Sequence, residues 1–168
     1  MGTLVERLAR ARIGDTFNQY RDERLAERLD RYLDRHADAP LLLVGEAAGY
    51  RGARVSGIPF TSERQLTGQP PGEATATVVH RVLAELELAD AVLLWNVVPT
   101  HPGTATANRA PTRREVEAGL PFARELARGR RVLAVGRIAE AALGAPYVRH
   151  PSHGGATHFR ETLSACLS

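Results

Sequence analysis

The chain has 168 residues with 43% apolar content, which predicts a single compact domain over residues 1–168. Its one cysteine, Cys166, excludes an internal disulfide and a metal cluster held by cysteines, and favours a reducing compartment. The formal net charge is +3 and all 22 basic residues are arginine, so a P-loop lysine, a lysine Schiff base and a lysine general base are excluded.

The chain carries no signal for secretion or for crossing a membrane. Its first residues are charged throughout, and no apolar run is long enough to span a bilayer. We therefore expect a soluble, cytoplasmic monomer without membrane contact. The arginines indicate either phosphate contacts, which the planar guanidinium suits, or a compositional bias that places arginine on solvated helix faces. The small net charge indicates an anionic partner only weakly.

Helical patterns open the chain. Thr3 and Glu6 form a capping-box pattern at the start of a first predicted helix. Leu25, Leu29 and Leu33 share one face of a second helix. Helical periodicity or composition predicts three longer helices further on, at 73–88, 112–129 and 156–167.

Short apolar runs alternate with these helices, and each run is followed by loop-forming residues. They predict buried parallel strands at 41–45, 91–95, 131–136 and, more weakly, 147–150. Thr112 and Glu115 form a second capping box before the helix that follows the second strand. The pattern predicts an α/β fold: a three-layer sandwich with a central, mostly parallel four-stranded sheet flanked by helices.

Ligands of open parallel sheets bind beyond the carboxyl ends of the strands, so the segments after the apolar runs are where a site is expected. The glycine-punctuated segment after the first run lacks the G-x-G-x-x-G spacing of a dinucleotide site, and no G-x-S-x-G elbow occurs. His150, His153 and His158 lack a carboxylate or cysteine pattern that would complete a metal site. We therefore expect neither a metal nor a cofactor.

Four motifs occur in order at or after these strands: "GEAAG", "GIPF", "WN" and "HPS". From about residue 41 to about residue 160 the chain thereby resembles the uracil-DNA glycosylase superfamily. The pattern is most similar to the bacterial iron–sulfur branch, but the positions around Pro99 and Gly119, where that branch carries cluster ligands, are not cysteine. The resemblance implies excision of uracil from DNA without a cluster.

The resemblance gives His150 a role in catalysis, because a hydrogen bond to uracil O2 would stabilise the negative charge of the departing base. Ser152, His153 and Gly154 would lie against a DNA strand, with His153 in the position of a wedge residue. The alternative is an ordinary loop between a strand and a helix, in which Ser152 acts as a cap.

The same resemblance places the base against Gly45, Ala47, Phe60 and Asn96. Asn96 would donate to uracil O4 and accept from N3–H, an arrangement that cytosine does not match. Phe60 would stack on the extruded base. The alternatives are a capping asparagine and a core phenylalanine.

Two carboxylates compete as the group that activates water. Glu46 follows the first strand and matches the glutamate of the iron–sulfur branch, whereas Glu63 stands where a second, broader-specificity branch has aspartate. Glu46 is favoured because it is nearer the strand end, and Glu63 could instead be a charge at the start of a helix. Ala47 and Ala48 depart from the acidic residue and proline of the superfamily pattern, and Gly49 replaces the bulky residue that blocks thymine in the best-known branch.

Four arginines are candidates for phosphate contacts with DNA: Arg51, Arg54, Arg109 and Arg149. The function predicted is that of a monofunctional glycosylase that flips uracil out of DNA and hydrolyses its N-glycosidic bond. A non-catalytic nucleic-acid or nucleotide binder of the same fold is the first alternative, and a hydrolase of free nucleosides is the second.

Overall fold

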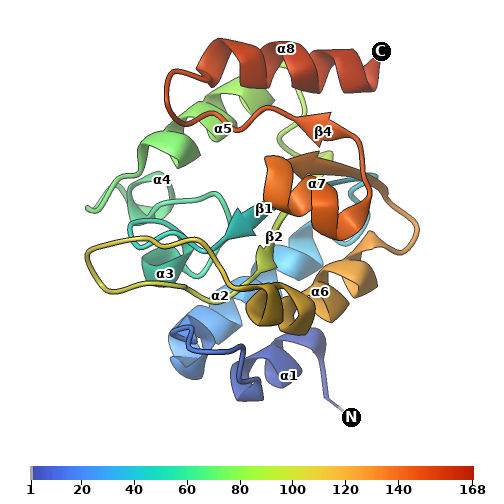
Figure 1. The fold of residues 1–168 in the computed structure, drawn as a ribbon. Helices are drawn as coiled ribbons and strands as arrows, with labels where there is room; N and C mark the ends of the chain where they lie inside the picture. The colour runs from blue at the N-terminus through green and yellow to red at the C-terminus, as the bar shows by residue number, and fades with distance from the viewer. Residues whose placement is uncertain (1) are drawn as a thin grey trace.

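A computed structural model describes residues 2–168, and a four-stranded sheet forms its centre (Figure 1). The strands are β1 (Leu41–Ala47), β2 (Val92–Val98), β3 (Arg131–Val135) and β4 (Tyr147–Val148). Their order across the sheet is β2-β1-β3-β4, and every neighbouring pair is parallel. This confirms the predicted α/β architecture.

The helices precede the first strand, connect successive strands and follow the last one. They are α1 (Leu4–Arg10), a 3-10 turn η1 (Gln19–Arg21), α2 (Glu23–Arg35), α3 (Ala53–Ser56), α4 (Glu63–Thr67), α5 (Ala74–Glu85), α6 (Arg113–Ala127), α7 (Arg137–Leu143) and α8 (Ala156–Leu167). None of the helices within residues 2–168 combines the length and the apolar character needed to cross a membrane.

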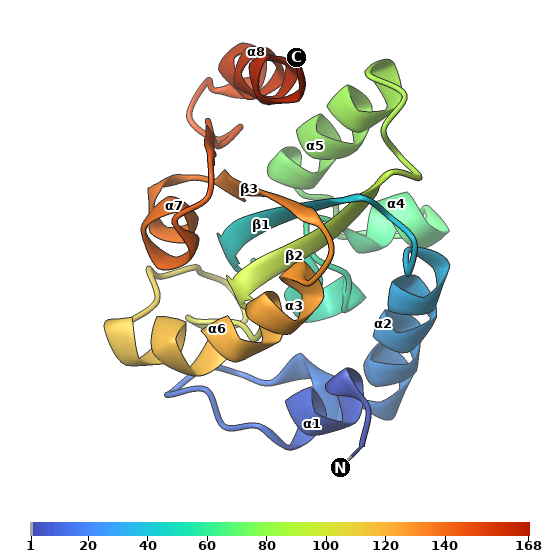
Figure 2. The same cartoon turned by 90° about the vertical axis from the view of Figure 1, so that its right-hand side faces the viewer.

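The strands are apolar on both sides, so each face of the sheet buries its own cluster. In β1, Leu42 and Val44 pack into the cluster beneath α1, α2, α6 and α7, while Leu41 and Leu43 pack into the cluster beneath α5 and α8. This alternation follows from the two-residue period of a strand. Figure 2 shows the resulting three layers, with the sheet between the two groups of helices.

The capping boxes and the helix starts follow the sequence prediction, but two strands run further than predicted. Thr3–Glu6 and Thr112–Glu115 both form reciprocal capping boxes. β1 continues to Ala47 and β2 to Val98, so that Glu46 and Asn96 lie inside strands and not after them. The extension arises because Ala47 pairs with Val98 across the two strands, which side-chain polarity does not reveal.

Helices α2 and α6 lie close to β2. A Cβ on Gly119 of α6 would overlap the carbonyl oxygen of Val97, so glycine permits the close approach of this helix to the strand. On the outer edge of β2, the Leu94 N–H donates to the hydroxyl of Tyr32 on α2 at 2.8 Å. The free edge of this strand is therefore partly satisfied by a side chain.

Glu115, at the start of α6, joins three segments although it is almost fully buried at 1% exposure. Its carboxylate accepts two hydrogen bonds from the Arg109 guanidinium at 2.7 and 2.9 Å, and further bonds from the backbone N–H groups of Thr112 and Asp15. The hydrogen bonds from Arg109 are the largest influence on this group and lower the pKa of Glu115 to about 2. Burial is the second largest influence and opposes this shift. This carboxylate therefore stabilises the fold in its ionised form.

We expect Glu115→Gln to destabilise the protein by roughly 2 kcal/mol at neutral pH, because hydrogen bonds to a charged group are lost while the volume is kept. The pKa of the folded state lies below the usual 4.5, so this contribution is complete above that pH and is lost as the pH falls toward 2. Urea unfolding at about pH 7 and about pH 3 measures it. Glu117→Gln, at an exposed ion pair on the same helix, is the control. An equal deficit of Glu115→Gln at both pH values would contradict this assignment.

Candidate active site

A pocket of about 570 Å³ lies beyond the carboxyl ends of β1 and β2, as expected for an open parallel sheet. Its size is in the range of small-molecule sites. The connections that follow β1 and β2 cover opposite faces of the sheet, and the pocket opens at this reversal. The side chains and backbone that line it come from the loops after β1, β2 and β4 and from the start of α5.

Many of the predicted site residues meet in this pocket, and a few do not. Those that line it are Glu46, Ala47, Arg51, Phe60, Asn96, Arg109, His150, Ser152 and His153. Those outside its lining are Gly45, Arg54, Glu63, Arg149 and Gly154.

The ring of Phe60 lies against the end of β1. A Cβ on Gly45 would overlap this ring and would stand 3.0 Å from Oδ1 of Asn96, so only glycine leaves room for both. Phe60 itself has φ of 54°, a left-handed conformation that is rare for a bulky residue. Such backbone strain persists where the surrounding structure fixes it. Here the strained residue presents its aromatic ring to the pocket.

Asn96 is the polar residue of β2 that faces the pocket. The residue as a whole is 4% exposed, and within residues 2–168 its amide, which lines the pocket, takes part in no hydrogen bond with another residue. A buried amide normally has partners, so this one is available to a ligand. It carries a donor and an acceptor side by side, which is the pattern needed to read one edge of a heterocyclic base.

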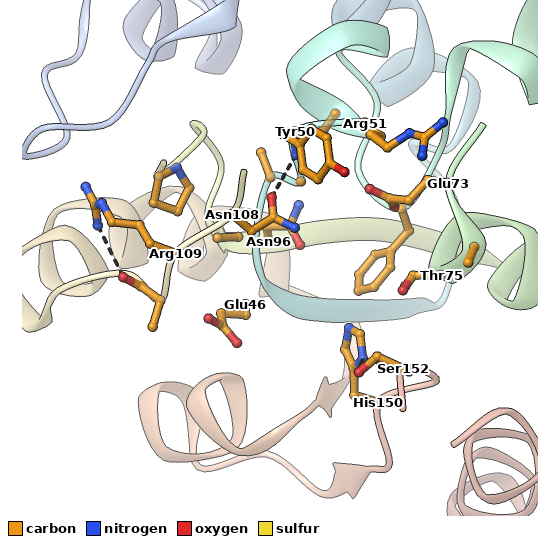
Figure 3. Close-up of a pocket in the computed structure, with 18 of the residues that line it drawn as sticks. Glu46, Tyr50, Arg51, Glu73, Thr75, Asn96, Asn108, Arg109, His150 and Ser152 are labelled. Atoms are coloured by element: carbon orange, nitrogen blue, oxygen red, sulfur yellow. Dashed lines mark hydrogen bonds between the residues drawn. The ribbon is translucent and has the colours of Figure 1, made fainter. Parts of the chain in front are cut away.

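His150 follows β4 and points into the pocket next to Ser152 (Figure 3). Its Nδ1 lies 3.1 Å from the backbone N–H of Ser152 and 2.7 Å from the Ser152 hydroxyl. Because a backbone N–H can only donate, Nδ1 is the acceptor, and a neutral ring must carry its proton on Nε2. Burial, and then the charges of Arg149 and His153, lower the pKa of His150 below the usual 6.5. The ring is therefore a neutral donor at physiological pH.

Glu46 brings a carboxylate to the same pocket from β1. Within residues 2–168 no hydrogen bond or ion pair holds this carboxylate, and burial raises the pKa of Glu46 above the usual 4.5. An acidic group in a partly desolvated cleft with a raised pKa is suited to accept a proton near neutral pH.

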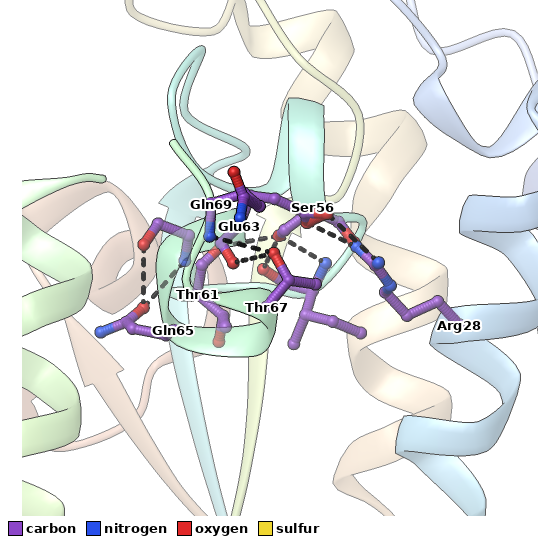
Figure 4. Close-up of polar contacts among 9 residues, drawn as sticks. Arg28, Ser56, Thr61, Glu63, Gln65, Thr67 and Gln69 are labelled. Carbon is purple, nitrogen blue, oxygen red and sulfur yellow. Dashed lines mark hydrogen bonds and ion pairs between the residues drawn. The ribbon is translucent and has the colours of Figure 1, made fainter. Parts of the chain in front are cut away.

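Glu63 lies elsewhere. It occupies the first turn of α4, where its carboxylate pairs with the Arg28 guanidinium at 2.7 Å, and the two side chains are only 14% and 19% exposed. Arg28 also donates to the Ser56 carbonyl, and the Ser56 hydroxyl donates to the Thr61 carbonyl (Figure 4). Glu63 thus belongs to a polar network that holds the segment carrying Phe60, which matches its alternative interpretation as a charge at the start of a helix.

The four predicted phosphate-binding arginines have different surroundings. Arg109 is paired with Glu115, and Arg54 donates to the carbonyls of Tyr50 and Ala105. Arg149 is bonded to the carbonyl of His150. Arg51 is exposed at the pocket mouth.

The loop after β4 ends in an exposed tip. His153 has φ of 53° and Gly154 has φ of 74°, so two successive residues are left-handed and the chain turns sharply before α8. Both residues are exposed, and His153 borders the pocket. The tip is therefore placed to contact a molecule that covers the pocket.

Sequence reasoning missed several contributors to the pocket, namely Tyr50, Glu73, Thr75 and Asn108. The Tyr50 N–H donates to Oδ1 of Asn108 at 2.9 Å, which joins the loop after β1 to the loop after β2 (Figure 3). Glu73 caps α5, and burial raises its pKa while Arg51 opposes the shift. No motif marks these residues, because they lie in the long connections between strands and away from the strand ends where a site is expected.

His101, which is fully buried, makes a second connection between the loop after β1 and the loop after β2. Its Nδ1 lies 2.7 Å from the Ala48 carbonyl oxygen and its Nε2 lies 2.6 Å from the Thr104 carbonyl oxygen. The backbone of His101 also pairs with that of Phe17 in the N-terminal segment.

The residues present do not fit a metal centre. Among the described residues, no group of three or more histidine, cysteine, aspartate or glutamate side chains is placed to hold an ion. Pro99 and Gly119, which correspond to cluster-ligand positions in the iron–sulfur branch, lie in contact, since a Cβ on Gly119 would be 3.1 Å from Cδ of Pro99. Neither offers a thiolate, and Cys166 lies on α8 beside the Tyr147 carbonyl.

The fold and the pocket define an α/β protein with a partly polar small-molecule site at the carboxyl edge of a parallel sheet. Residues 33–165 match the family model of the uracil DNA glycosylase superfamily, and the chain belongs to this superfamily. Among solved structures, the chain is similar to wild-type SMUG2 of Pedobacter heparinus, with a TM-score of 0.67 and 13% identity over 99% of this chain and 97% of that chain. That likeness shows the fold. A comparison with curated proteins found no match.

We expect His150 to be neutral with its proton on Nε2 at about pH 7, because Nδ1 accepts from the Ser152 N–H. Nitrogen-15 NMR of labelled histidine, followed during a pH titration, distinguishes the two tautomers and should place the pKa of His150 below 6.5. Ser152→Ala removes the hydroxyl but keeps the backbone donor, so the tautomer should persist. A proton on Nδ1 at neutral pH would contradict this geometry.

Proposed function

We propose that this protein hydrolyses the N-glycosidic bond of uracil in DNA and leaves an abasic site. The observation that carries the proposal is the meeting of an unpartnered, buried Asn96 amide and an Nε2–H donor of His150 in one pocket. Membership of the superfamily supports the same class of reaction. The exposed loop tip and Arg51 at the pocket mouth support a DNA strand as the bound partner.

The reaction requires that the enzyme stabilise negative charge on the departing base. When the bond between C1′ and N1 breaks, its electron pair stays on N1, the uracil ring becomes an anion and the sugar becomes an oxocarbenium ion. In this proposal Nε2–H of His150 donates to O2, where the charge develops, and Asn96 donates to O4 and accepts from N3–H. A donor that binds the anion more strongly than the neutral base lowers the barrier.

A water molecule must then attack C1′ and lose a proton. We propose that Glu46 accepts this proton, because it is the carboxylate of β1 in the pocket and has no partner among the described residues. Phe60 would stack on the base that has left the helix. Arg51, Ser152, His153 and Gly154 would contact the DNA backbone around it.

Purified protein should release uracil from an oligonucleotide in the presence of a chelator and leave the abasic strand intact, because the chain has no lysine for imine-driven cleavage. His150→Ala should lower the single-turnover rate by roughly a hundredfold, as for removal of one oxyanion donor. Chromatography of the free base and gel analysis of the strand measure both. Binding without release would instead identify a non-catalytic binder, and equal hydrolysis of free deoxyuridine would identify a nucleoside hydrolase.

Glu46→Gln and Glu63→Gln separate the two candidate carboxylates. Glu46→Gln should slow single-turnover excision by roughly 10²- to 10⁴-fold, the usual range for loss of a general base, while Glu63→Gln should mainly lower stability through loss of the Arg28 pair. Since burial raises the pKa of Glu46, the acid limb of the parent's rate profile should lie above pH 4.5, and Glu46→Gln should abolish that limb. A large rate loss in Glu63→Gln alone, with the fold intact, would reverse the assignment.

A further inference from the structure

We propose that Glu73, the residue immediately before α5, forms the wall of the pocket against C5 of the base and thereby excludes thymine. This inference rests on the proposed function. It concerns a residue that lies outside the loop after β1, where position 49 carries no side chain.

The first observation is the place of the Glu73 carboxylate. A Cβ built on Gly49 would lie 2.5 Å from Oε2 of Glu73, and one built on Gly52 would lie 2.7 Å from the same oxygen. The carboxylate therefore fills the space into which side chains of this loop would project. The half-buried Glu73 also lines the pocket, so the volume that the loop leaves open is filled from the other side by α5.

The second observation is the direction in which the base must lie. In a pyrimidine ring C2 and C5 are opposite each other, so a base whose O2 meets His150 turns its C5 edge away from that residue. Its O4 and N3 edge, which Asn96 would read, lies between the two. All three residues line the pocket, and in Figure 3 Glu73 lies above His150, with Asn96 to the left of both. Glu73 is therefore on the side that C5 would face.

A methyl group at C5 would meet the carboxylate in two unfavourable ways. It would compete for space already filled, and it would strip the carboxylate of the solvent that remains to it. Burial already raises the pKa of Glu73, although Arg51 opposes this shift. The carboxylate is therefore poorly solvated already, and a methyl group would remove part of the solvation that remains. The C5–H of uracil has neither problem. The wall thus separates uracil from thymine by one methyl group.

The experiment compares uracil and thymine, each opposite guanine, in single-turnover excision by the parent, Glu73→Ser and Glu73→Gln. Serine shortens the side chain but is favoured at the N-cap position, which Glu73 occupies before Ala74 of α5. The helix should therefore form in this variant. The ratio of thymine to uracil excision should rise in Glu73→Ser on the order of 10- to 200-fold, the range for admitting one methyl group to a pocket. Glu73→Gln keeps the volume and should change the ratio much less.

A rescue variant tests the wall directly. In the Glu73→Ser background, Gly49→Ala places a Cβ where the carboxylate oxygen had been, and it should lower the thymine-to-uracil ratio again. Equilibrium binding of DNA with a non-hydrolysable 2′-fluoro-deoxyuridine or its 5-methyl form gives a second readout that does not depend on chemistry. Circular dichroism establishes that each variant is folded.

The possible results separate the two levels of the argument. If the parent excises uracil and both the excision ratio and the binding ratio stay unchanged in Glu73→Ser, the C5 wall is not Glu73. If Glu73→Ser slows both substrates equally, Glu73 acts only by holding Arg51 or the loop, and the inference is overturned. If the parent releases no uracil, the proposed function fails, and the inference fails with it.

Discussion

The pocket depends on His101, a fully buried side chain whose two ring nitrogens lie against two backbone carbonyls. One carbonyl belongs to Ala48, in the loop after β1, and the other to Thr104, in the loop after β2. Without the ring, the buried carbonyl of Ala48 would lose its partner, at a cost of about 1–3 kcal/mol, while the carbonyl of the exposed Thr104 could turn to solvent. The backbone of the same residue pairs with Phe17, so the N-terminal segment is attached as well. His101, together with the hydrogen bond from the Tyr50 N–H to Asn108, therefore holds the loops after β1 and β2 next to each other.

Much of the fold could be predicted from the sequence, because local sequence patterns indicate most of its strands and helices. The strands are runs of branched and apolar residues buried on both faces, and the capping boxes at Thr3 and Thr112 mark helix starts through their own side chains. Local patterns do not fix where a strand ends, since β1 and β2 continue for as long as their partners pair. The short helices α3 and α4 were not predicted, because four and five residues are too few to show a period.

For the site, the sequence indicated the residues that follow strands but not those that the fold brings in from the side. The strand ends located the segments that carry Glu46, Asn96 and His150, the resemblance to the superfamily singled out these residues, and the structure places all three in the pocket. Glu63 was a candidate by its spacing alone, and spacing does not show that Arg28, on a helix formed much earlier in the chain, lies beside it. Glu73 was missed for the converse reason: only the bare backbone of the facing glycines shows that its carboxylate fills part of the pocket.

The edges of the sheet have a consequence for how this chain behaves at high concentration. Exposed strand edges offer free N–H and C=O groups to which a second molecule can add a strand, and this is a common route to aggregation. Here one edge strand, β4, has only two residues, and the other, β2, is buried along its whole length with its Leu94 N–H occupied by the hydroxyl of Tyr32. Neither edge provides a long template for strand addition. Replacement of Tyr32 by phenylalanine would remove the hydroxyl acceptor and leave the Leu94 N–H without this partner in a buried strand.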